Sequence, residues 1–267
     1  MKQTELLFEF SSVSIAAALF VCILVANEVS HRLGVMVQSR TDDEVKAHTG
    51  AVQASILGLL ALLLGFTFSM SMQRFDNRSM AVIDESNAIG TVLLRTELLP
   101  PEQREPAKAL LAEYVDVRVA MGKTNLTQSQ QHEEQLQRTV QIQTQLWTLA
   151  VEATDIDPRP VTTGAFVKAL NDMIDAQGKR TAISQAHVPE PILLLLFFVF
   201  IASIGMMGYS SGLSGKRVLA PLVLVALLIT LIVFIIVDLD RPKRGLIQVD
   251  QSALQGLVSN TAEFKHE

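Results

Sequence analysis

Four long apolar runs divide this chain, and none of them contains a charged side chain. A transmembrane helix needs about 20 predominantly apolar residues to cross a hydrocarbon core about 30 Å thick. The second and fourth runs reach this length unaided, and the other two reach it with their flanking residues. The pattern therefore predicts four transmembrane helices. Their uncharged parts are Ser11–Ala26, Ala51–Met72, Ile192–Tyr209 and Val218–Val237.

The first run follows a short charged segment, so a cleaved signal peptide is the alternative to a retained span. A signal peptide begins with positive charge and ends at a small-residue cleavage site. Here the leader contains Glu5 and Glu9, and Val25-Ala26-Asn27 fits such a site poorly. We therefore predict a retained span that Leu6–Phe10 complete, followed by a polar connection.

The second run passes into a charged segment without a helix-breaking residue. No proline occurs between this run and Pro100, so we expect the helix to continue well outside the bilayer. Thr41–Glu44 fits a capping box, which would start the helix before the membrane, although an ordinary acidic loop is the alternative. Gly58 and Gly65 lie near one face and predict the close approach of another helix.

The region between the second and third spans has helical periodicity and no alternating strand pattern. Prolines and glycines mark the ends of its helices. We expect helices at 101–122, 127–154 and 163–185, with a turn at Asp155–Pro160. After the third span, the short segment Gly212–Arg217 forces the fourth span to return antiparallel.

These elements predict an all-α, polytopic membrane protein with a helical insertion between its second and third spans. Four spans place both termini and the insertion on one side. Lysines and arginines are more numerous on that side, so the positive-inside rule predicts that it is cytoplasmic. The expected divisions are residues 1–72 (spans one and two), 73–190 (the insertion), 191–237 (spans three and four) and 238–267 (the tail). The basic residues are Lys2, Arg74, Arg78, Lys179, Arg180, Arg241, Lys243 and Arg244 on the predicted cytoplasmic side, against Arg32, Arg40, Lys46, Lys216 and Arg217.

Composition agrees with a membrane protein and argues against several other classes. Hydrophobic residues make up 49% of the chain and charged residues 18%, with a mean hydropathy of +0.33. An average soluble domain is less apolar and more charged. The net charge of −5 and the scattered basic residues argue against nucleic acid binding. No histidine or cysteine spacing predicts a metal site or a cofactor, and no catalytic motif predicts an enzyme.

The helical extension beyond the second span carries polar side chains beside an apolar stripe. One interpretation is an ordinary solvated face next to a core-packing face. The other is a polar lining at the mouth of a membrane pathway, where charged residues set ion preference. We expect Arg74, Arg78 and Glu85 to make interhelical or intersubunit contacts. The candidate residues of this polar exit are Arg74, Asp76, Arg78, Glu85 and Asn87.

Several short motifs resemble the bestrophin-like family of bacterial membrane proteins. The similarity covers about two-thirds of the chain, and the stretch Glu85-x-Asn87-Ala88-Ile89-Gly90 is its most specific part. The other matching motifs are Leu64-Gly65-Phe66-Thr67-Phe68-Ser69, Arg74-Phe75-Asp76-x-Arg78, Leu170-Asn171-x-Met173-Ile174-Asp175, Arg180 and Val188-Pro189.

The resemblance implies a bacterial inner-membrane protein with four membrane helices and a helical domain between the second and third. Bestrophins are pentameric ion channels whose second membrane helix forms an apolar neck with residues at i, i+4 and i+8. The comparable row is Leu62, Phe66 and Met70, of which Phe66 alone is aromatic. The acidic calcium clasp of animal bestrophins has only Asp238 and Asp240 as counterparts, so calcium gating is not expected here.

Two functions are compatible with these observations. The first is a homo-oligomeric channel for ions in the lipid bilayer, with the second span and its extension lining the path. The second is a membrane-anchored helical interaction module that does not conduct. The absence of an ionisable residue in Ala51–Met72 fits both, because a neck can gate by dewetting. It argues against a proton-coupled transporter, which buries an ionisable group at membrane depth.

Overall fold

The structure is a computed structural model that describes residues 10–123, 129–215, 217, 219–241 and 245–262. All regular secondary structure within these residues is helical, as predicted. The chain divides into two compact units. We call Met1–Arg74 with His187–Arg241 the membrane unit, and Phe75–Ala186 with Pro242–Glu267 the insertion unit. The helices are α1 (Ser12–Val37), η2 (Gln38–Arg40), α2 (Asp43–Arg95), η3 (Thr96–Leu98), α3 (Pro101–Lys123), α4 (Ser129–Ile156), α5 (Thr163–Gln185), α6 (Glu190–Leu213), α7 (Leu219–Leu239) and α8 (Ser252–Ala262).

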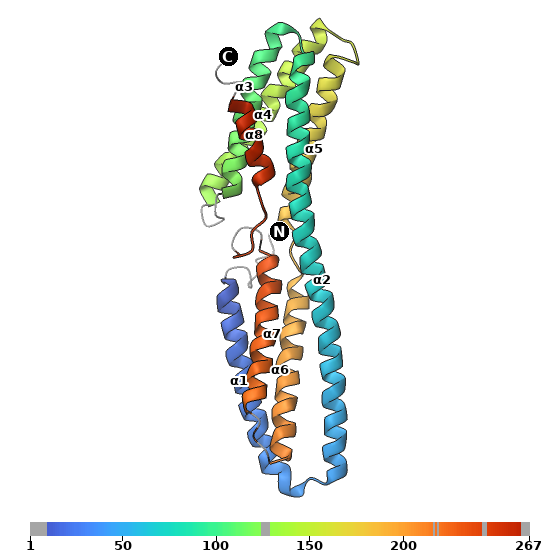
Figure 1. Cartoon of the computed structure of the whole chain (residues 1–267), viewed down its shortest axis with the longest axis vertical. Helices are drawn as coiled ribbons and strands as arrows, with labels where there is room; N and C mark the ends of the chain where they lie inside the picture. Colours follow the sequence, from blue (N-terminus) through green and yellow to red (C-terminus); the bar gives the residue numbers. More distant parts are fainter. Residues whose placement is uncertain (1–9, 124–128, 216, 218, 242–244, 263–267) are drawn as a thin grey trace. The chain divides into compact units, whose positions relative to one another are not determined.

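Four helices of the described chain are long and apolar enough to cross a membrane, which confirms the predicted number of spans. They are α1, α2, α6 and α7. In the membrane unit, α1, α6 and α7 lie side by side (Figure 1). Side chains from all three fill their shared core, so these helices bury one another's apolar faces. Its most buried members include Ile23, Leu196, Phe200, Ile204, Ala226, Val233 and Ile236.

The first helix differs from its predicted bounds. It begins at Ser12, where the Ser11 hydroxyl accepts a hydrogen bond from the Ser14 amide and caps the helix. It then runs to Val37, beyond the predicted end near Ala26. The expected extension through Leu6–Phe10 falls mostly outside the described residues, and Phe10 itself is not helical. Within this polar segment Glu28 pairs with Arg32 at i and i+4, an arrangement that favours a helix by a few tenths of a kcal/mol.

The start of α2 precedes the membrane, as expected, but the predicted capping box does not form it. The helix begins at Asp43, and the Thr41 hydroxyl instead donates a hydrogen bond to the Val37 carbonyl behind it. Asp43 pairs with Lys46 in the first turn, with 2.9 Å between Oδ1 and Nζ. An acidic first turn also complements the positive end of the helix dipole.

Glycines permit a close helix crossing, although not the ones predicted to do so. Gly58 and Gly65 on α2 have open space where a side chain would point. The close crossing joins α1 and α6 instead. A Cβ on Gly212 would collide with the His31 carbonyl oxygen, and one on Gly208 with the Asn27 carbonyl oxygen. Absent side chains let the two backbones approach, as in other membrane helix pairs.

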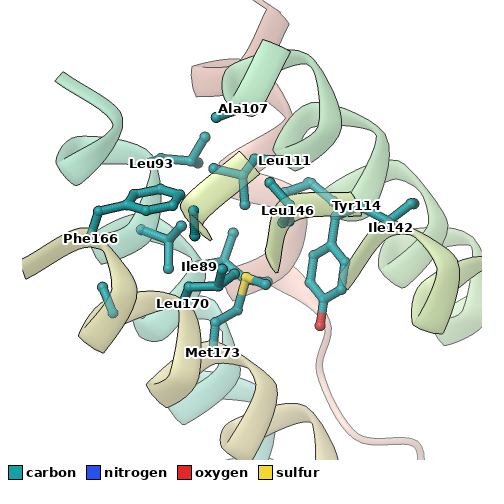
Figure 2. Close-up of a cluster of buried hydrophobic side chains, with 14 of the residues drawn as sticks. Ile89, Leu93, Ala107, Leu111, Tyr114, Ile142, Leu146, Phe166, Leu170 and Met173 are labelled. Atoms are coloured by element: carbon teal, nitrogen blue, oxygen red, sulfur yellow. The ribbon is translucent and has the colours of Figure 1, made fainter. Parts of the chain in front are cut away.

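The insertion unit is a helical bundle with one contiguous apolar core (Figure 2). It combines the last part of α2 with α3, α4, α5 and α8. The three predicted helices of the insertion are present as α3, α4 and α5, with described ends that agree within about two residues. The predicted start of the second helix at residue 127 lies outside the described residues. Leu254 of α8 is fully buried in this core, so the tail is a structural part of the unit. The core also contains Ile89, Leu111, Tyr114, Ile142, Leu146, Phe166, Leu170 and Met173.

We expect Gly212→Ala to destabilise the protein by about 1–3 kcal/mol, because the new methyl group must push α1 away from α6. Alanine is a better helix former than glycine by about 1 kcal/mol. Helix propensity alone would therefore stabilise this variant, and a loss of stability must come from the altered packing. Gly178→Ala in α5 is the matched control, since nothing lies near its Cβ position. Thermal unfolding of the detergent-solubilised chain measures both. A Gly212→Ala protein as stable as the control variant contradicts the close crossing.

Candidate functional site

The membrane part of α2 is the least buried of the four spans. In its most apolar window only 11% of residues are buried, against 33–50% in the other three. Leu62 is 54% exposed and Phe66 is 64% exposed, so both point away from the rest of the chain. Met70 is half-buried against the core of the membrane unit. Successive i, i+4 positions rotate by about 40° on a straight helix, which explains why the third member of the row turns inward.

The part of α2 in the insertion unit also has an exposed face. Asp76 and Asn87 lie on it, whereas Arg74, at the end of the membrane unit, is half-buried. Large apolar side chains share this face with them: Met80 and Leu94 are 56% and 79% exposed. Of the five predicted exit residues, the structure therefore places two on an open surface.

Glu85 lies at the centre of a buried ionic cluster in the insertion unit. Its side chain is fully buried, and two arginines from other helices neutralise it. Arg118 of α3 donates from Nε to Oε1 at 2.6 Å and from Nη2 to Oε2 at 3.1 Å. Arg180 of α5 donates from Nη1 to Oε2 at 2.5 Å. The Tyr114 hydroxyl lies 3.5 Å from Oε1, so one carboxylate holds α2, α3 and α5 together.

The cluster extends to the tail and perturbs the acid–base properties of its members. Arg180 also donates from Nη2 to the side-chain oxygen of Gln251, at 2.8 Å. Burial alone would raise the pKa of the Glu85 carboxyl, but the charges and hydrogen bonds of Arg118 and Arg180 outweigh it and lower that pKa. Burial, followed by the nearby Glu85 charge, raises the pKa of Tyr114.

Arg78 is buried elsewhere in the insertion unit. Its Nη2 donates to the Ala186 carbonyl at 2.7 Å, so it ties α2 to the end of the α5 segment. The interhelical contacts expected of Arg78 and Glu85 are therefore present. Both side chains are buried within the chain, so they do not themselves line an open polar surface of it.

The sequence did not identify the partners of Glu85. Arg118 follows Tyr114 by one helical turn on a face of α3 that is otherwise apolar. A charged residue on a core-facing stripe requires a buried partner of opposite charge. The position of Arg118 was therefore the feature of the sequence that pointed to a buried carboxylate. Arg180 belongs to the basic residues counted for topology and to the family motifs, and neither pattern links it to Glu85.

The end of α7 holds a second group of buried charges, within the membrane unit. Asp240 accepts a hydrogen bond at Oδ2 from the Val188 amide, at 2.9 Å. Arg241 donates to the Phe10 carbonyl. Within the described residues, no group of three or more histidine, cysteine or acidic side chains could hold a metal ion. The acidic residues here are engaged by the protein itself.

We expect Glu85→Gln to cost about 3–5 kcal/mol of stability, because it leaves two buried arginines without their counter-charge. Glu97→Gln is the matched control: its carboxylate pairs with Lys108 at 2.8 Å but is 55% exposed, so a loss of about 0–1 kcal/mol is expected. Chemical or thermal unfolding of the full chain in detergent tests both. Equal, small losses would mean that the cluster contributes no more than a surface pair.

The same cluster predicts a pH dependence with a defined sign. A carboxyl whose pKa is lowered by folding stabilises the native state above its unfolded pKa, and that contribution is lost as pH falls through the native pKa. The stability difference between wild type and Glu85→Gln is therefore expected to be full at neutral pH and to shrink below about pH 4.5. Unfolding midpoints measured from pH 7 to pH 3 test this, and a difference that grows on acidification contradicts it.

Comparison with known proteins identifies the family to which this chain belongs. The model of the bestrophin-like domain matches residues 15–254, which is most of the chain. No curated protein matches. Two crystal structures of a bacterial bestrophin homolog from Klebsiella pneumoniae, each carrying a single mutation, have the same fold. One has 14% sequence identity and a TM-score of 0.66, covering 94% of this chain and 100% of that chain. The other has 13% identity and a TM-score of 0.69, covering 94% and 98%.

At such identities the structural likeness establishes the fold alone, whereas the domain match extends over nearly all of the helices described above. The structural likeness covers 94% of this chain, with its four candidate spans and its helical insertion between the second and third. The protein is a multi-pass membrane protein and belongs to the bestrophin-like family.

Proposed function

We propose that this protein is a homo-oligomeric ion channel in which α2 lines the conducting pathway. The observation that carries the proposal is the exposed apolar face of α2 in the membrane unit. In its most apolar window only 11% of α2 is buried, against 33–50% in the other three spans, and α2 presents Leu62 and Phe66 outward. In a homo-oligomer, this face of α2 from several copies of the chain can surround a common axis. The similarity to a bacterial bestrophin homolog supports the same assignment.

The insertion unit supplies an independent argument for a protein partner. Lipid can cover the apolar side chains of a membrane span, but not those far outside it. Leu94 lies 22 residues beyond Met72, a distance of about 33 Å along a helix, and it is 79% exposed. Met80 and Ile83 are exposed on the same helix. Exposed apolar patches mark interaction sites in soluble regions, and a second copy of the chain is the occupant we propose.

The proposed pathway has an apolar neck followed by polar residues. Phe66 is the bulkiest exposed residue of the candidate row, and an apolar constriction can stop ions by excluding water. Asp76 and Asn87 are the exposed polar candidates beyond the span. In this proposal the Glu85 cluster positions α2 within the insertion unit, and it contacts no ion itself.

A membrane-anchored interaction module is the second candidate, and one surface favours it. The outer face of α4 presents Val140, Trp147 and Val151 to solvent. No charged residue occurs from Thr139 to Val151. Cores of protein interfaces are depleted in charge and enriched in tryptophan, so this face suits a protein partner in a chain that does not conduct.

We also propose that both termini and the insertion lie in the cytoplasm, as the distribution of basic residues suggests. In a Cys22→Ser background, Gln131→Cys in α4 should react with an impermeant thiol reagent only after the cells are opened. Ser39→Cys is the matched control, because it is exposed in the connection between α1 and α2, on the opposite side. Labelling of Gln131→Cys in intact cells would show that the insertion lies outside the cytoplasm and that the proposed orientation is wrong.

For conduction itself we expect Phe66→Ala to raise basal ion flux in liposomes, because truncation widens a dewetted constriction. Leu224→Ala is the control: Leu224 is an exposed apolar residue on α7, outside the proposed path. It should leave flux unchanged. Thermal stability is measured on the same preparations, since loss of mere packing would lower stability without opening a path.

The outcomes separate the two functions. Higher flux in Phe66→Ala than in both wild type and Leu224→Ala supports a neck at this position. No measurable flux in any of the three proteins, with correct incorporation into the bilayer, contradicts the channel and favours the anchored module.

A further inference from the structure

Two segments of the membrane unit contact each other: the one that precedes α6 and the one that follows α7. His187 is the first residue of the membrane unit on the α6 side, and Arg241 is its last residue after α7. The two segments are joined by side chains. Asp240 accepts from the Val188 amide at 2.9 Å, and His187 Nδ1 lies 3.2 Å from the Asp240 carbonyl oxygen.

The chemistry of the His187 ring at this position is defined by its neighbours. A carbonyl oxygen only accepts hydrogen bonds, so Nδ1 must carry the proton that it donates to Asp240. The same Nδ1 is 3.7 Å from Asp240 Oδ2, and that carboxylate is 2% exposed. His187 retains 26% exposure, so water and protons reach it. A proton added to the ring would therefore place a full charge beside a buried carboxylate, where charges interact more strongly than in water.

Other charged residues stand close by in sequence, at the end of α7 and at the start of α6. Asp238 lies buried in the last turn of α7, and Glu190 begins α6. Arg241 is buried and donates to the Phe10 carbonyl. Beside His187 in the chain, the Ala186 carbonyl accepts from Arg78 of α2.

We propose that His187 and Asp240 form a protonation-sensitive latch between the start of α6 and the end of α7. The neutral ring donates a hydrogen bond to the Asp240 carbonyl, and the protonated ring adds an ion pair with the Asp240 carboxylate. Histidine is the side chain whose charge ordinarily changes between about pH 5 and pH 8. The latch therefore tightens as the compartment containing the insertion acidifies. It acts whether or not the protein conducts ions.

The test compares variants of the full chain in detergent at about pH 8 and about pH 5.5. His187→Asn retains an amide donor near the Nδ1 position but cannot gain a proton. On acidification, wild type should gain about 2–4 °C in Tm relative to this variant, the shift expected of one moderate interaction in a chain of this size. His48→Asn, which removes an exposed histidine of α2, should follow wild type.

Asp240→Asn completes a double-mutant cycle, because its side-chain oxygen can still accept from Val188. In that background the pH-dependent gain of His187 should disappear. The latch is overturned if wild type and His187→Asn respond identically to pH. It is equally overturned if their difference persists unchanged in the Asp240→Asn background. Should Asp240→Asn fail to fold, the comparison of His187→Asn with His48→Asn over the same pH range decides alone.

Discussion

The arrangement of the insertion unit depends on one buried carboxylate. Glu85 is fully buried and accepts hydrogen bonds from Arg118 and Arg180. Desolvating three charges is expensive, and the cost is recovered only when geometry and hydrogen bonding are nearly complete. Apolar contacts are non-directional, so an apolar residue at this position would not by itself select which helix faces meet. The paired charges instead fix which faces of α2, α3 and α5 meet.

The apolar core and the ionic cluster stabilise the insertion unit in different ways. Leu111, Phe166 and Leu170 supply the non-directional burial that makes the bundle stable (Figure 2). Tyr114 belongs to both, since its ring lies in the core and its hydroxyl reaches Glu85. The tail joins the same assembly through Leu254 and Gln251. A segment that follows the fourth span is in this way built into the core of a domain inserted before the third.

The fold could be predicted from the sequence because its signals are local. Charge-free runs define the spans, and proline and glycine define the ends of α3 and α5 to within a residue or two. The misjudged features depend on distant contacts. Gly58 and Gly65 have the spacing of a packing face, yet Gly208 and Gly212 make the close crossing because α1 lies against them. The candidate site divides similarly: exposure of Leu62 and Phe66 follows helical phase, whereas the arginines that neutralise Glu85 come from helices 33 and 95 residues away.

Three buried hydroxyls within the spans donate hydrogen bonds to carbonyls of their own helices. Thr67 donates to the Leu63 carbonyl, Ser203 to Val199 and Thr230 to Ala226, each at 2.7–2.8 Å. Such hydroxyls need no ion or partner to offset their burial. With no charge between Ala51 and Met72, the membrane part of α2 offers an ion little to replace its hydration shell. If α2 lines a pathway, passage through the span is therefore controlled by width and wetting, and ion preference must arise where charged residues first appear beyond it.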